Sequence, residues 1–176
     1  MRGASSSHSA AALRIGRLAR SMMKGKIDHV LVQFESRGSL ATTHKSQGSD
    51  MGLFGGLMGW DLTDERLMDY AALMAASEID LKIEIREFPT HSPNIYKLIL
   101  SNADEQHELI ADSVGGGMIE VISIDGVPFS IAGDCHETLI FVDAEIPALR
   151  TELLTHYMED EVFEHADGKV VEIKSQ

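Results

Sequence analysis

Glycines recur at nearly one-turn intervals in an apolar segment in the first half of the chain. They are Gly52, Gly55, Gly56 and Gly59, and Leu53, Phe54, Leu57 and Met58 stand between them. Because glycine has no Cβ, a helix with this spacing lets another backbone approach closely. We therefore predict a short, closely packed helix over residues 51–58. A phosphate-binding loop is a poor alternative, because the Lys and Ser/Thr of that motif do not follow the glycines.

Hydroxyl groups and one imidazole gather where the first helix is predicted to begin. The segment consists of Ser5, Ser6, Ser7, His8 and Ser9. The helical spacing of Ala11, Ile15, Leu18 and Met22 predicts an amphipathic helix over residues 9–23, with Ser9 as its N-cap. The side chains and unpaired amide groups of a first helical turn can converge on one anion. We therefore predict a binding site for a carboxylate or a phosphate at this helix start.

The net charge of −13 is unevenly distributed along the 176 residues. The first 26 residues hold six Lys and Arg residues and no acid, so the remainder carries a net −19. An anion would be drawn to the N-terminal end, whereas nucleic acid is not an expected partner of so acidic a chain. Arg14, Arg17 and Arg20 share a helix face that is either solvated or binds a partner.

The rest of the chain alternates between strand and helix patterns. Residues 29–35 alternate, with Val30, Val32 and Phe34 on one face, which predicts a half-buried strand. Further strands are predicted over residues 81–86, 95–100, 107–113, 118–124, 128–132, 138–142 and 169–173, and further helices over residues 64–77 and 145–158. We expect an α/β (α+β) fold, in which residues 1–136 form the main domain and residues 137–176 a strand–helix–strand tail.

The cysteine count and the hydropathy limit the cofactors and the location. Cys135 is the single cysteine, so the chain cannot form an internal disulfide, hold an iron–sulfur cluster or complete a structural zinc site. Any such cofactor must come from another chain. No apolar run approaches the ~18–20 residues of a membrane helix, and the first residues lack the order of a signal peptide. We therefore expect a soluble, cytoplasmic protein.

Three polar segments are candidates for one composite site. They are residues 5–9, 44–50 and 91–94, and each adjoins a predicted regular element. The serines and the helix amides would hold a carboxylate, while His8 or Lys45 would move a proton. The alternatives are a His8 side chain that bonds a backbone carbonyl and a Lys45 that is only solvated.

Two other kinds of site are not favoured. A metal site of His8, His44 and His91 would lack any pair with helical ligand spacing. A serine hydrolase is also disfavoured, because the Gly-x-Ser-x-Gly pattern of the nucleophile elbow is absent.

Four separated motifs occur in an order that is specific to one family. They are Ser5-Ser6-Ser7-His8-Ser9 followed by Arg14-Ile15-Gly16-Arg17; Gly38-Ser39-Leu40-Ala41 followed by Lys45 and Gly48-Ser49-Asp50; His91-x-Pro93-Asn94; and Gly115-Gly116-Gly117. In order and approximate spacing they resemble the β subunit of iron–sulfur-dependent L-serine dehydratases, over residues 3–142. The resemblance implies an allosteric-substrate-binding type of α/β domain with a mixed sheet, followed by a partial ACT-like tail.

The resemblance also implies a two-subunit lyase that acts on L-serine or a related hydroxy acid. An α chain would carry the [4Fe–4S] cluster as Lewis acid for the leaving hydroxyl, and this chain would be inactive without it. The implied catalytic residues here are His8, His44 and Lys45. The implied substrate-binding residues are Ser5, Ser6, Ser7, Ser9, Gln47, Gly48, Ser49, Asp50, His91 and Asn94, and no metal ligand is implied.

The sequence departs from the family at a residue that bears on catalysis. Gln47 stands where the family has the His of a Lys-Gly-His-Gly-Thr-Asp run, and glutamine cannot take up a proton near neutral pH. His8, His44 or Lys45 would then be the base, or the substrate would differ from serine, or the chain would not catalyse. The alternative function is a non-catalytic regulatory domain that binds a small carboxylate.

Overall fold

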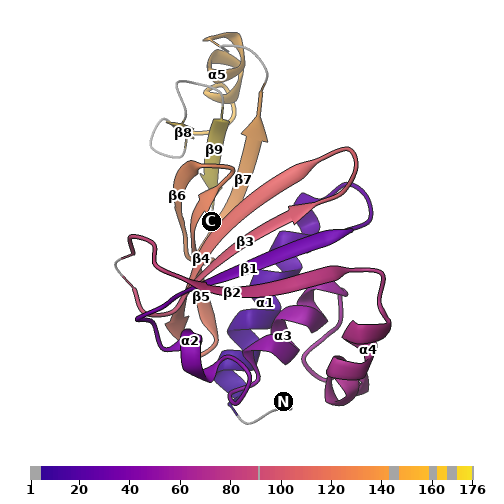
Figure 1. Ribbon diagram of the computed structural model, residues 1–176. Coiled ribbons are helices and arrows are strands. Elements are labelled where there is room, and N and C mark those ends of the chain that lie inside the picture. The colour runs from indigo at the N-terminus through magenta and orange to yellow at the C-terminus, as the bar shows by residue number, and fades with distance from the viewer. Residues whose placement is uncertain (1–4, 91, 143–146, 159–161, 166–169, 176) are drawn as a thin grey trace.

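The computed structural model describes residues 5–90, 92–142, 147–158, 162–165 and 170–175. The chain forms a six-stranded sheet with helices packed on one face, and a smaller sheet near the C-terminus (Figure 1). The elements are α1 (Ser6–Met22), β1 (His29–Glu35), α2 (Leu40–Thr43), α3 (Ser49–Leu57), the 3-10 helix η1 (Glu65–Asp69), α4 (Tyr70–Ala76), β2 (Asp80–Arg86), β3 (Ile95–Ser101), β4 (Gln106–Gly115), β5 (Met118–Ile124), β6 (Val127–Ile131), β7 (His136–Phe141), α5 (Pro147–Leu153), β8 (Val162–His165) and β9 (Val170–Ser175). Within the described ranges, no helix is long and apolar enough to span a membrane.

The large sheet has the strand order β2-β1-β3-β4-β5-β6. β1 and β2 run parallel, joined by the crossover that contains α2, α3 and α4, and the other neighbours are antiparallel. The predicted α/β class with a mixed sheet is therefore confirmed. The Asp125-Gly126 turn between β5 and β6 has φ of 50° and 79°, as a tight hairpin turn requires.

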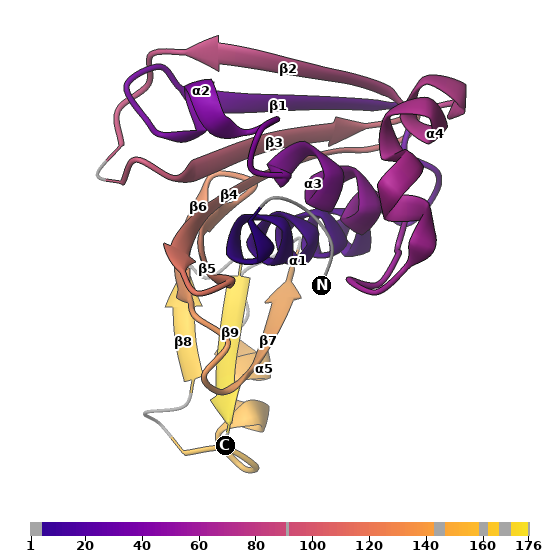
Figure 2. The ribbon, with the colours of Figure 1, turned by 90° about the horizontal axis from the view of Figure 1, so that it is seen from below.

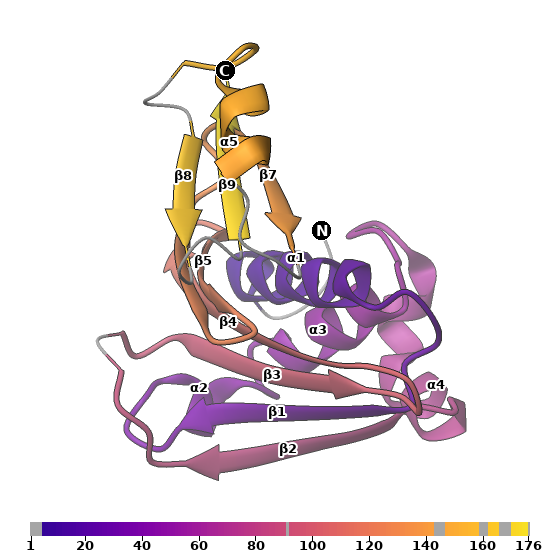
Figure 3. The same cartoon turned by 90° about the horizontal axis from the view of Figure 1, so that it is seen from above.

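The inward face of β1 and β3 forms the centre of the core. Val30, Val32 and Phe34 of β1 are at most 1% exposed, which confirms the alternation predicted for residues 29–35. Their cross-strand partners on β3, also buried, are Leu100, Leu98 and Tyr96. Figures 2 and 3 show α1 and α3 on the same side of β1 and β3, with the small sheet beyond α1.

α1 and α3 pack with their backbones in contact. A Cβ atom on Gly52 would lie 2.2 Å from the carbonyl oxygen of Ser9, and one on Gly56 would lie 2.2 Å from that of Leu13. On the facing helix, a Cβ atom on Gly16 would meet the backbone of α3 at 2.4 Å. The glycine spacing thus predicted the close approach correctly, and the partner is the N-terminal helix.

The N-terminal helix begins earlier than predicted. Ser5, rather than Ser9, is the N-cap, and it has extended φ and ψ of −134° and 111°. The amide of Ser9 already donates to the carbonyl of Ser5 at 3.1 Å, and its hydroxyl donates to the same carbonyl at 3.0 Å. Since Ser9 therefore lies inside the first turn, the prediction of its capping role was wrong.

The polar stretch over residues 38–50 contains α2 and the start of α3. The helix predicted over residues 64–77 is divided into η1 and α4. Asp64 is the N-cap of η1, because its side chain accepts a hydrogen bond from the amide of Arg66.

The C-terminal segment forms a three-stranded antiparallel sheet in the order β7-β9-β8. α5 covers one face, where Leu149 and Leu153 pack against Val162, Val171 and Ile173. The strand–helix–strand prediction missed β8, because four residues are too short for a recognisable alternation. α5 also ends at Leu153, before the predicted residue 158, and residues 145 and 146 lie outside the described ranges.

Candidate functional site

The start of α1 leaves its first backbone amides uncapped by side chains. The Ser5 hydroxyl makes no capping bond and is instead hydrogen-bonded to Nδ1 of His8 at 2.8 Å, with the Ser7 hydroxyl 3.3 Å away. The first amides of a helix have no partner within the helix. Ser5, Ser7 and His8 are half-buried, while Ser6 is exposed. The helix start therefore presents amides, hydroxyls and an imidazole close together, and anion binding there stays a prediction.

Gly48 brings the second polar segment against this helix start. Gly48 has a φ of +82°, a left-handed conformation that favours glycine, and it is the residue that precedes α3. A Cβ atom at this position would lie 2.6 Å from Oγ of Ser9. Both the conformation and the contact therefore favour glycine, and they place the loop over residues 44–50 beside residues 5–9.

Within this loop, His44 is held by Asp50. Nδ1 of His44 lies 2.6 Å from Oδ1 of Asp50, and the two side chains are only 14% and 9% exposed. The ring of His44 also packs on Phe34, with the centroids 5.3 Å apart. The amide of Ser49 donates to the carbonyl of His44 at 2.9 Å, which closes the loop. Because Nδ1 is occupied, Nε2 is the nitrogen of His44 that remains for a substrate.

Two buried hydroxyls lie next to this pair. Ser49 and Tyr96 are fully buried, and although the two hydroxyls are close, neither meets the geometry of a hydrogen bond. Burial raises the pKa of Tyr96 to about 12, an effect that the Ser49 hydroxyl opposes and the Asp50 carboxylate increases. Burial and the same carboxylate raise the pKa of Tyr70. The aromatic surroundings of Asp50 were missed from the sequence, although the alternation of β3 marks Tyr96 as inward-facing.

The third predicted segment contacts Ser39, which precedes the second segment in the chain. The Ser39 hydroxyl donates a short hydrogen bond to Oδ1 of Asn94, and the Ser39 amide donates to the carbonyl of Pro93 at 3.0 Å. Asn94 is thus beside the loop that leads to His44. His91 lies outside the described residues.

The triple glycine forms a turn that touches the helix start. Gly115, Gly116 and Gly117 all have positive φ, of 100°, 61° and 83°, in the turn between β4 and β5. A Cβ atom on Gly117 would lie 3.1 Å from that of Ala10 and 3.8 Å from the carbonyl oxygen of Ser7. This turn therefore belongs to the neighbourhood of the predicted anion site.

The predicted proton-transfer residues occupy different settings. His8 is bonded to Ser5, and His44 to Asp50, whereas Lys45 is exposed and Gln47 is half-buried. In the described part of the chain, no hydrogen bond joins His8 to His44 or to Lys45. The two histidines are therefore separate candidates for proton transfer.

Cys135 lies away from this site, at the start of the small sheet. Asp134, Cys135 and Glu137 each place one potential ligand atom within 4.8 Å of the others, but Glu137 already pairs with Lys174 at 3.0 Å. Burial and the neighbouring Glu137 and Asp134 carboxylates raise the pKa of the Cys135 thiol. One protonated thiol among acids does not provide the several thiolates of an iron–sulfur cluster. A [4Fe–4S] cluster therefore does not fit the residues of this chain.

Comparison with known proteins identifies relatives of the chain. No protein-family model matches it. It is 35% identical over 142 residues to a probable L-serine dehydratase β chain of Bacillus subtilis, and the match covers 81% of this chain and 63% of that protein. It is 29% identical over 143 residues to the L-serine dehydratase β chain of Peptoniphilus asaccharolyticus, covering 80% of this chain and 63% of that protein. The chain thus spans under two thirds of the length of these curated relatives. The resemblance predicted from the motifs is confirmed, since the chain is similar to two L-serine dehydratase β chains over about four fifths of its own length.

Proposed function

We propose that this chain is the β chain of a two-subunit dehydratase that acts on L-serine or a related hydroxy acid. In this proposal, the start of α1 and the loop over residues 44–50 form one wall of a site that an α chain completes. The observation that carries the proposal is the hydrogen-bonded pair of His44 and Asp50, held next to the helix start by the contact of Gly48 with Ser9. The main body would be an allosteric-substrate-binding type of domain over residues 1–136, followed by a partial ACT-like tail.

The substrate carboxylate would bind at the start of α1. The uncapped amides of Ser6, Ser7 and His8 and the hydroxyls of Ser5 and Ser7 are neutral donors, and the partial positive charge of the helix start adds to their attraction. Ser9 would support the loop instead, because its buried hydroxyl donates to the Ser5 carbonyl. Exposed Lys45 would add a positive charge for the substrate.

His44 is the better base for removing the α-proton of the substrate. A carboxylate bonded to one imidazole nitrogen fixes the tautomer, so Nδ1 keeps its proton and Nε2 accepts one. His8 is bonded to a neutral hydroxyl that can either donate or accept, so its tautomer is not fixed in this way. Of the two histidines among the predicted candidates, His44 lies closer to Gln47 in the chain, so it would replace the family histidine missing there.

The [4Fe–4S] cluster would be carried by the α chain, where it would assist the departure of the substrate hydroxyl. This chain would bind the carboxylate, orient the substrate and remove the α-proton. Loss of water from serine then leaves an enamine, whose imine form hydrolyses to pyruvate and ammonia.

Anaerobic co-expression with a cysteine-rich α-chain candidate from the same organism tests the proposal. We expect a complex that forms pyruvate from L-serine, and a loss of about 10²-fold or more in turnover for His44→Gln. His107→Gln is a matched control, because His107 is also bonded to a carboxylate, that of Asp125 at 2.8 Å, but on β4. Full turnover by the His44→Gln complex would refute the role of His44, and failure to form any iron-containing complex would refute the subunit assignment.

Gln47 favours a second candidate function, a regulatory domain that binds a small carboxylate without catalysis. Gln47 is half-buried next to Gly48 and cannot exchange protons. This function predicts that serine binds the isolated chain in calorimetry while no complex turns it over. A Gln47→His variant that gains serine dehydration in the complex would contradict it and favour a lyase with altered specificity.

A further inference from the structure

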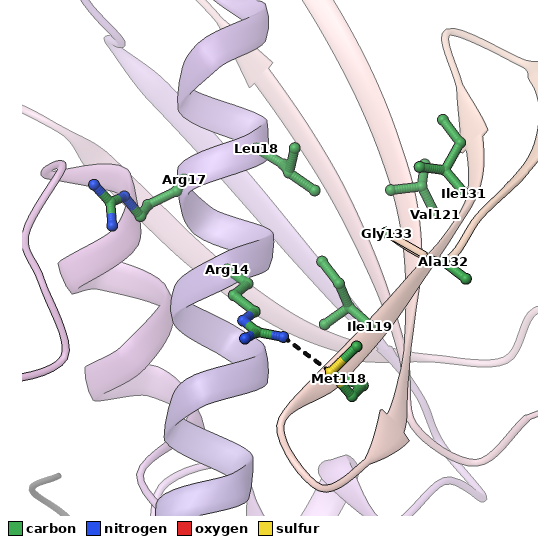
Figure 4. Close-up of a pocket in the computed structure, with 9 residues that line it drawn as sticks. All are labelled: Arg14, Arg17, Leu18, Met118, Ile119, Val121, Ile131, Ala132 and Gly133. Atoms are coloured by element: carbon green, nitrogen blue, oxygen red, sulfur yellow. Dashed lines mark hydrogen bonds between the residues drawn. The ribbon is translucent and has the colours of Figure 1, made fainter. Parts of the chain in front are cut away.

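An apolar cavity of about 520 Å³ lies between α1 and the hairpin of β5 and β6 (Figure 4). Leu18 of α1 and Ile119 of β5 point into the space between the two elements. The lining residues are Arg14, Arg17, Leu18, Met118, Ile119, Val121, Ile131, Ala132 and Gly133. Cavities of a few hundred Å³ with mostly apolar walls and a few polar groups are typical of small-ligand sites.

The cavity continues along α1 toward the small sheet. A second cavity of about 400 Å³ shares Leu18, Val121 and Ile131 with the first. It ends against Leu139 and Phe141 of β7. Because they share these three residues, the two cavities are treated together and called here the α1–β5 groove. Its walls are mostly apolar, and Ser21 and Glu137 are polar residues of the second cavity.

Arg14 places a positive charge at this groove, and it forms no ion pair within the described ranges of the chain. Its only side-chain hydrogen bond among the described residues is donated by Nη1 to the sulfur of Met118 at 3.2 Å, and Figure 4 shows it as a dashed line. A thioether is a weak acceptor, so the guanidinium keeps its other donors for a ligand. Arg17 also lines the first cavity, but its guanidinium is already paired with Asp61 at 2.9 Å.

We propose that the α1–β5 groove binds a small monocarboxylate with an apolar body. The carboxylate would accept hydrogen bonds from Arg14, and planar guanidinium and carboxylate groups bond in pairs. The hydrocarbon body would lie on Leu18, Ile119 and Val121, which now face the open cavity. Serine does not fit this chemistry, because its hydroxymethyl group would lose hydrogen bonds to water against these walls.

This ligand site is distinct from the site at the helix start. Arg14 lies six residues beyond His8, so the two are ~9 Å apart along the helix axis. Among the described residues, none of the groove-lining side chains belongs to the predicted serine-binding set.

Titration calorimetry of the full chain with hexanoate tests this proposal, without any α chain. We expect saturable 1:1 binding that weakens about three- to fourfold for each methylene removed, in pentanoate and butyrate. Arg14→Gln should weaken hexanoate binding at least tenfold, whereas Arg20→Gln, a variant of the same helix at a residue that lines neither cavity, should bind as the parent does. Ala132→Phe, which fills the groove from an exposed position, should abolish binding while the far-ultraviolet circular dichroism stays unchanged.

Three results would overturn the proposal. They are no hexanoate binding by the parent chain, binding that is equal in Arg14→Gln, or binding that serine displaces. Because these measurements involve no turnover, they can fail while the proposed dehydratase function holds, and the reverse is also true.

Discussion

Nδ1 of the His44 imidazole lies 2.6 Å from Oδ1 of the Asp50 carboxylate, although the two residues stand at the ends of different helices. His44 follows the last residue of α2, and Asp50 lies in the first turn of α3. The left-handed Gly48 reverses the chain between them, and the amides of Ser49 and Asp50 both donate to the carbonyl of His44. A short loop thus creates a nearly buried His–carboxylate pair beside a helix start.

We expect Asp50→Asn to lower turnover of the reconstituted complex by about 10²-fold, because the amide no longer fixes the tautomer of His44. The effect should lie in kcat, with KM little changed, since the carboxylate of the substrate binds elsewhere. Steady-state kinetics with L-serine measure both constants. Asp61→Asn is the control, because Asp61 is exposed and pairs only with Arg17 in the described structure. Equal kinetic constants for the two variants would contradict the orienting role.

Gly48→Ala should destabilise the chain more than Gly126→Ala does. Both glycines have positive φ, of 82° and 79°, so both variants suffer the cost of a left-handed residue, about 1–2 kcal/mol. Only at Gly48 would the new Cβ also meet Ser9, whereas nothing lies within 4 Å at Gly126. Urea unfolding gives the free energy of unfolding of both variants, and the difference between their losses is the cost of the contact with Ser9. Equal losses would show that the loop does not depend on its contact with Ser9.

Gly56→Ala should separate α1 from α3. The added methyl group would meet the carbonyl of Leu13 at 2.2 Å and the amide of Arg17 at 2.8 Å, and neither backbone atom can move alone. Overpacking of this kind costs about 1–3 kcal/mol, which lowers the melting temperature by ~2–4 °C per kcal/mol in a chain of this size. Thermal unfolding of the parent chain and of Gly56→Ala measures this fall in melting temperature. Gly25→Ala is the control, since its nearest contact is an ordinary 3.4 Å to the side chain of Asn102, and a similar loss there would argue against the helix contact.

Tyr96→Phe should make stability less dependent on pH in the alkaline range. The pKa of Tyr96 is raised by burial to about 12 in the folded chain, against about 10 for an exposed tyrosine. Its protonated form therefore contributes stability that is fully present below pH ~10 and is lost as the pH rises toward ~12. The slope is at most about 1.4 kcal/mol per pH unit.

Denaturant unfolding between pH 9 and 12 measures this slope, and the difference between parent and variant isolates Tyr96 from other groups that titrate there. Near pH 7 the variant should be about as stable as the parent, because the lost hydroxyl has no regular hydrogen bond. Tyr157→Phe serves as the control, because Tyr157 is 37% exposed. A parent and a Tyr96→Phe variant with the same alkaline slope would contradict the role of burial.

The regular patterns of the sequence determined most of the elements. Alternation identified β1 from Val30, Val32 and Phe34, and the spacing of Gly52 and Gly56 identified a helix that another backbone approaches. These features are local, because burial of one face repeats with the period of the element itself. Boundaries were less certain. Ser9 was predicted to cap a helix that Ser5 begins, because several serines in a row offer equally good caps.

The sequence also determined which residue types stand near the candidate site, namely the serines, His8, His44 and Asp50. It did not determine which of them meet. The bond between His44 and Asp50 depends on the left-handed turn at Gly48, and the neighbourhood of Ser9 depends on the packing of α3 on α1. The charge at Arg14 faces an open groove only because β5 and β6 lie beside α1. Such relationships join residues far apart in the chain, so packing in three dimensions decided them.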